Sequence, residues 1–160
     1  MAVEAPLSKH KKTNFKIYIG ACIIISVIFG YDGYLSKYEW SHRRSFYEKH
    51  IKDGRPDETM IFNRITPIVL AAGAVGLAVR FRALKDKKLL ADENELVISD
   101  REKISYDSIQ KIDKTHFDAT KGYFVVTYKN KDGREVNRKI DSRTYDGLGA
   151  VLDELVAKIS

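Results

Sequence analysis

The chain of 160 residues is 44% hydrophobic and 31% charged, an average that matches one ordinary soluble domain. Its net charge of +6 comes from residues 1–84, which hold 13 Lys and Arg against 7 Asp and Glu, whereas residues 85–160 hold 15 of each. Nucleic-acid binding requires a basic face, so no nucleic-acid partner is expected for a neutral C-terminal domain. The single cysteine, Cys22, excludes an internal disulfide and a cysteine-rich metal site.

Two apolar stretches without charge, residues 17–31 and 65–79, predict two transmembrane helices. Their flanks extend them toward the about 20 residues that cross a bilayer, giving helices over 15–35 and 64–84 after a basic N-terminal tail, 1–14. Two alternatives are a pair of buried helices in a soluble protein and a cleaved signal peptide. Neither stretch has a polar face, and the first is followed by no small-x-small cleavage site.

Small residues predict how the two helices meet. Cys22, Ser26 and Gly30 recur every four residues on the first helix, and Ala72 and Gly76 do so on the second. Small side chains at this spacing allow close approach of helix backbones in a membrane. Helix–helix packing is therefore expected at these positions, and Cys22 is interpreted as a packing residue.

Basic residues near the ends of the spans indicate the orientation. The tail and the stretch after the second helix are rich in lysine and arginine, which favours both termini in the cytoplasm and a two-span protein. The loop at 36–63 also holds basic residues, so an inverted topology stays open. Asp32, at the end of the first span, is expected to pair with an arginine or lysine of the loop.

The loop at 36–63 is rich in aromatic residues and is expected to contain a helical extension of the first span or an interfacial helix that lies among the lipid headgroups. Trp40, Arg44 and Tyr47 would then share one helical face. These residue types are the usual anchors of protein interfaces, so they form a candidate docking surface for another membrane protein. The alternative is an aromatic belt at the level of the lipid headgroups.

From residue 85 onward the sequence predicts an α+β domain. Six short strands are expected at 89–91, 95–98, 103–105, 109–115, 123–129 and 134–140, and Asp132-Gly133 marks the turn of the last hairpin. A final helix carries one apolar stripe suited to closing a curved sheet: Leu148, Val151, Leu152, Leu155, Val156 and Ile159.

Ile104, Tyr106, Ile109 and Ile112 follow an Ile-x-Tyr-x-x-Ile-x-x-Ile pattern that resembles bacterial pleckstrin-homology-like (PH-like) domains, which often lie beside transmembrane helices in small membrane proteins. The resemblance covers residues 89–160. It implies a partial barrel of antiparallel strands, capped by the C-terminal helix, that binds lipid headgroups, peptides or proteins. Phosphoinositide-binding members carry basic residues between their first two strands, and the matching stretch here, 92–95, is acidic.

The function expected from these patterns is a non-enzymatic, membrane-anchored interaction module, acting as an accessory or scaffold subunit of a membrane protein assembly. The sequence contains no common catalytic, phosphate-binding or metal-binding motif, so no cofactor and no metal are expected. One alternative is a sensor of lipid headgroups that uses the basic residues after the second span: Arg80, Arg82, Lys85, Lys87 and Lys88. Another is a component of a small enzyme or transporter that uses Asp32 or a histidine.

Overall fold

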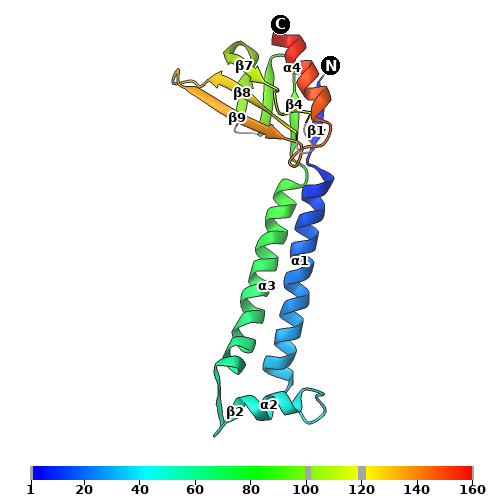
Figure 1. The fold of residues 1–160 in the computed structure, drawn as a ribbon, viewed down its shortest axis with the longest axis vertical. Helices are drawn as coiled ribbons and strands as arrows, with labels where there is room; N and C mark the ends of the chain where they lie inside the picture. Colours follow the sequence, from blue (N-terminus) through cyan, green and yellow to red (C-terminus); the bar gives the residue numbers. More distant parts are fainter. Residues whose placement is uncertain (1, 100–101, 119–121, 160) are drawn as a thin grey trace. The chain divides into compact units, whose positions relative to one another are not determined.

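The computed structural model describes residues 2–99, 102–118 and 122–159 (Figure 1). The chain divides into two compact units. The first, called here the sheet unit, comprises Met1–Thr13 and Arg82–Ser160, and the second, the helical unit, comprises Asn14–Phe81. The sheet unit therefore takes residues from both sides of the helical unit in the sequence.

Two long helices dominate the helical unit. α1 spans Lys9–Gly30 and continues into a π-helical turn at Tyr31–Leu35, and α3 spans Glu58–Leu84. Both helices are long and apolar enough to cross a membrane. None of the described residues of α1 is buried, and α3 buries only Met60, Asn63, Pro67 and Ala74. Helices that are apolar all round and bury so little are suited to lipid.

A short connector, residues 36–57, joins these helices. It contains the helix α2 (Arg44–His50) and a two-stranded ribbon of β2 (Ile51–Lys52) and β3 (Arg55–Pro56). Asp53 and Gly54 form the turn with φ of 51° and 74°, the conformation of a tight hairpin turn. The first span ends at Leu35 without the helical extension expected in the loop, and the next helix is the separate α2, which begins at Arg44.

All six predicted strands are present, and each bound lies within two residues of its predicted position. β4 (Lys88–Ala91), β5 (Glu95–Ser99) and β6 (Glu102–Ser105) belong to one antiparallel sheet. β7 (Ile109–Asp113), β8 (Tyr123–Lys129) and β9 (Glu135–Asp141) form a second. Gly133, with φ of 75°, lies in the turn between β8 and β9, as the Asp-Gly pair predicts.

The sheet unit also contains β1 (Val3–Pro6), a strand that was not predicted. It pairs antiparallel with β4 in the register Val3 to Ala91, and it makes the first sheet four-stranded in the order β1-β4-β5-β6. The residues interpreted as a basic tail thus supply an edge strand with a fully buried Ala5. Four residues are too few to show a period, and the partner strand lies far away in the sequence.

The core of the sheet unit lies between the two sheets and α4 (Leu148–Ile159), which packs against β1 and β4 (Figure 1). Leu148, Val151, Leu152 and Leu155 of the predicted stripe are buried, whereas Val156 and Ile159 are exposed. The core also takes in Ile104, Tyr106 and Ile109, with Ile112 partly buried against it. The Tyr106 hydroxyl donates to the carbonyl of Asp92 at 2.7 Å.

Candidate functional site

The two helices of the helical unit meet along a seam centred on Pro67. The Ser26 hydroxyl donates to the carbonyl of Pro67 at 2.9 Å, and a Cβ placed at Gly30 would lie 3.7 Å from the Pro67 Cβ. Because apolar solvent offers no competing hydrogen-bond partner, a serine at such a seam is satisfied by the facing helix. Ser26 and Gly30 therefore lie where the first helix was predicted to pack.

Gly33 makes the closest backbone approach of the seam. A Cβ at this position would lie 2.5 Å from the carbonyl oxygen of Asn63, a distance that real Cβ atoms do not adopt. Asn63 lies four residues before Pro67, whose ring nitrogen has no hydrogen to donate back to that carbonyl. The missing helical hydrogen bond thus frees an oxygen at the point where Gly33 comes closest.

The remaining predicted packing residues differ in how far they are buried. Cys22 is a half-buried free thiol, whereas Ala72 and Gly76 are exposed, and nothing lies within 4 Å of a Cβ added at Gly76. Ala74 is the buried small residue of this stretch instead. The sequence from Ala71 to Gly76 offers small residues on several faces, so spacing alone does not identify the one that packs.

An ion pair braces the connector at its start. The Arg43 guanidinium binds both carboxylate oxygens of Asp32, at 2.8 Å from Nε and 2.8 Å from Nη2. This hydrogen-bonded pair, which confirms the pairing expected for Asp32, holds the pKa of Arg43 above its ordinary value. A bidentate pair fixes direction as well as distance, so it sets the path of the chain where it leaves α1.

The candidate docking residues lie on this connector, but not on one helical face. Trp40 precedes α2 and stacks on Tyr38, with 5.5 Å between ring centroids and 10° between planes. The two side chains are 65% and 42% exposed. Arg44 lies at the start of α2, where its guanidinium pairs with Glu48 at 2.9 Å and covers the ring of Tyr47. The structure thus brings Arg44 and Tyr47 together and pairs Trp40 with Tyr38.

A second brace closes the connector at the start of α3. Asp57 accepts a hydrogen bond from the backbone N–H of Met60 at 2.9 Å, as helix-capping residues do, and its other oxygen lies 2.7 Å from His50 Nδ1. The bond to His50, followed by the Met60 bond, lowers the pKa of the Asp57 carboxyl. This pair was not predicted from the sequence, although an Asp directly before a helix is a recognisable cap.

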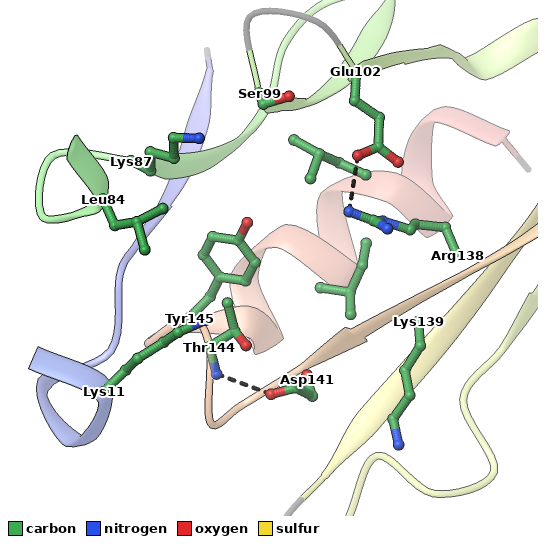
Figure 2. A pocket seen from close by; sticks show the side chains of 12 residues that line it. Lys11, Leu84, Lys87, Ser99, Glu102, Arg138, Lys139, Asp141, Thr144 and Tyr145 are labelled. Atoms are coloured by element: carbon green, nitrogen blue, oxygen red, sulfur yellow. Dashed lines mark hydrogen bonds and ion pairs between the residues drawn. The ribbon is translucent and has the colours of Figure 1, made fainter. Parts of the chain in front are cut away.

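The sheet unit contains a pocket of about 470 Å³ at the end where β4 begins and β5 and β9 finish. Figure 2 shows Arg138 and Glu102 paired on one side of it and Lys11 and Lys87 on the other. The Arg138–Glu102 pair measures 2.8 Å. The pocket also includes the ring of Tyr145, which is half-buried.

The five predicted headgroup residues are all exposed, and they differ in their surroundings. Lys87 lines the pocket, whereas Lys88 pairs with Glu4 across β1 and β4, and Lys85 lies 3.9 Å from its neighbour Asp86. Arg80 and Arg82 lie in the last two turns of α3. Lys11 and Tyr145 were not predicted as site residues, because they come to line one pocket with Lys87 only in the folded sheet unit.

Searches against protein families, curated proteins and solved structures found no match for this chain. Within the described residues, no group of three or more His, Cys, Asp or Glu side chains is placed to hold a metal ion. The two features that remain as candidate sites are the aromatic pair of the connector and the pocket of the sheet unit.

Proposed function

We propose that this chain is a membrane-anchored interaction protein that binds another integral membrane protein as an accessory or scaffold subunit. The observation that carries the proposal is the stack of Tyr38 and Trp40, two large aromatic side chains that are exposed on a connector braced at both ends. Exposed aromatic residues on a fixed backbone bind at low entropic cost, because little freedom is lost on contact.

The pairing of β1 with β4 supports a two-span topology for the proposed anchor. β1 ends at Pro6, just before α1, and β4 begins at Lys88, just after α3, and the two strands are hydrogen-bonded neighbours. If α1 and α3 cross the bilayer, both strands must lie on the same side, and the connector lies on the opposite side. The basic residues at the two outer helix ends favour the cytoplasm for the sheet unit.

The sheet unit is proposed to be a PH-like domain whose first strand is supplied from before the first span. Two antiparallel sheets and the C-terminal helix around one core support this assignment, as does the burial of Ile104, Tyr106 and Ile109 from the sequence pattern. Anchoring such a domain beside a partner raises its effective concentration there, so a weak contact is sufficient.

Crosslinking in the native membrane, followed by mild detergent extraction and mass spectrometry, tests the proposed partner. A stoichiometric membrane protein is expected with the unmodified chain and is expected to be lost with the double substitution Tyr38→Ala/Trp40→Ala. Tyr18→Ala is the matched control, because Tyr18 is 59% exposed on α1, outside the connector. Equal recovery of the partner with both variants would contradict docking through the stack, and absence of any partner would contradict the proposal itself.

Single cysteines in a Cys22→Ser background test the topology with a membrane-impermeant thiol reagent. Cysteine at Glu4 in β1 and at Lys131 in the β8–β9 turn is expected to react from the same side. Cysteine at Glu39 in the connector is expected to react only from the other side. Reaction of positions 4 and 131 from opposite sides would overturn the two-span arrangement.

A further inference from the structure

We propose that the pocket of the sheet unit binds a phosphate-bearing anion, with the Lys11 and Lys87 ammonium groups and the Tyr145 hydroxyl as its ligating groups. This binding site is separate from the docking surface on the connector. The chemistry shared by its ligands is a phosphate monoester or diester, carried by an anionic phospholipid headgroup or by a soluble phosphate ester.

The charges around the pocket leave two cations available. Arg138 is engaged by Glu102 at 2.8 Å, and the Lys139 ammonium lies 3.7 Å from the centre of the Tyr123 ring. Asp141 accepts the backbone N–H of Thr144 at 2.9 Å and so caps the turn that follows β9. Among the residues that the structure describes, no carboxylate lies within ion-pair distance of the lysines at positions 11 and 87.

Hydrogen bonds within the unliganded chain hold the backbone around Lys11 in place. The backbone N–H of Lys11 donates to Ser8 Oγ at 3.1 Å, and this fully buried serine also donates its own N–H to the carbonyl of Thr144 at 2.8 Å. The N–H of Lys9 binds the carboxylate of Asp146 at 2.9 Å. The start of α1 and the loop that carries Tyr145 are therefore tied together, which lowers the entropic cost of placing both groups on one anion.

Tyr145 supplies a neutral donor to the pocket. A tyrosine hydroxyl, whose ordinary pKa is about 10, is protonated at neutral pH and can donate to an anion, and burial raises the pKa of Tyr145 further. Figure 2 shows the Tyr145 ring standing within the pocket between the backbone of the loop and β5. A protonated hydroxyl and two ammonium groups are all donors, which is the complement that phosphate oxygens require.

The place of the pocket along the chain suits a headgroup, and this step rests on the proposed membrane insertion. Lys11 precedes Phe15, the first residue of the predicted span, by about 6 Å of helix, and Lys87 follows the last residue of α3 by three positions. The acidic turn at 92–95 lies at the other end of β4 and β5. Along the chain, the pocket end of β4 and β5 is therefore the end connected most directly to the spans, and the acidic turn is farther from them in sequence.

Titration calorimetry of the full chain in a neutral detergent tests the site. Short-chain phosphatidylglycerol is the probe and short-chain phosphatidylcholine is the reference. The double substitution Lys11→Gln/Lys87→Gln is expected to weaken phosphatidylglycerol binding roughly thirtyfold, because each juxtamembrane basic residue is worth about fivefold. Lys12→Gln/Lys85→Gln is the matched control, because it removes the same charge from neighbouring positions that do not line the pocket.

A second variant, Tyr145→Phe, keeps the half-buried ring and removes only the hydroxyl. It is expected to weaken binding severalfold while the melting temperature of the sheet unit stays unchanged. Titration with glycerol 3-phosphate distinguishes the sources: binding of the soluble ester that the pocket variant loses identifies a soluble ligand, and binding of phosphatidylglycerol alone identifies a lipid. Equal losses in the pocket variant and the matched control, or no binding of either probe, would overturn the proposal.

Discussion

The two units of this chain place the same kinds of side chain in opposite surroundings. In the sheet unit Phe124, Val126 and Leu155 are fully buried against one another and their neighbours. In the helical unit Ile24 and Val27 are 62% and 66% exposed, and most of the apolar surface of α1 contacts no other part of the unit. The helical unit is the more apolar of the two, with 35 hydrophobic residues among its 68 against 35 among the 92 of the sheet unit, yet it buries far fewer of them.

The two units therefore differ in how much of their apolar surface they bury within themselves. Removing apolar surface from water stabilises a fold by about 25 cal/mol per Å², and the sheet unit obtains this from its own core. The helical unit leaves its apolar faces open and obtains its internal contacts from a narrow seam at Ser26, Gly33 and Pro67. If the two helices span a membrane as proposed, lipid covers these faces, and the narrow seam is enough to hold the helices together.

The largest effect on the free energy of unfolding is expected from Phe124→Ala in the core of the sheet unit. It removes a fully buried ring from the sheet unit and leaves a cavity, so the free energy of unfolding should fall by about 3–5 kcal/mol. Hydrogen exchange of the strands in the full chain, measured in denaturant, reports this loss. Val27→Ala, on the exposed face of α1, should change this free energy by less than about 0.5 kcal/mol. Comparable losses from the two substitutions would contradict the difference in burial between the two units.

An intermediate effect is expected from Gly33→Ala in the seam. The new Cβ would lie 2.5 Å from a backbone oxygen of α3, so the helices must separate, at a cost of about 1–3 kcal/mol. The thermal transition of Trp40 fluorescence reports it, because this single tryptophan lies in the connector between the helices. Gly20→Ala is the control, since nothing lies within 4 Å of its added Cβ. Equal transitions for the two variants would show that the seam does not hold the helices.

The smallest effect is expected at acid pH, from a substitution of Asp57. The pKa of Asp57 is lowered in the fold, so its contribution to stability is complete above the unfolded pKa, about 3.9, and is lost as the pH falls through the folded value. Asp57→Asn should therefore flatten the decline of the Trp40 transition temperature below about pH 4. Asp53→Asn, in the nearby turn, is the control and should leave the decline unchanged. An identical decline in Asp57→Asn would show that another group controls it.

How far the sequence predicts this protein depends on how local each signal is. The six strands of the C-terminal region follow from a period of two and from turn residues such as Gly133, which lie within a few positions of one another. β1 was not predicted, because its burial depends on pairing with β4, which lies far along the chain.

The candidate sites divide in the same way. The Asp32–Arg43 pair could be predicted because charges at a span end require a partner nearby. Ala72 and Gly76 were assigned to the helix contact, yet Ala74 is the buried small residue of α3, seven positions after the buried Pro67 and therefore on the same face of the helix. Lys11 and Tyr145 come together only through the loop that follows β9.

The edge strand β1 also sets an order of events during synthesis. Val3 leaves the ribosome long before its partner Ala91, and both long helices are made in between. Closing so long a loop is slow, so the sheet unit is completed late, and until then β4 has an unpaired edge. If the two helices span a membrane as proposed, β1 can complete the sheet only when it lies on the side of the membrane where the remaining strands emerge.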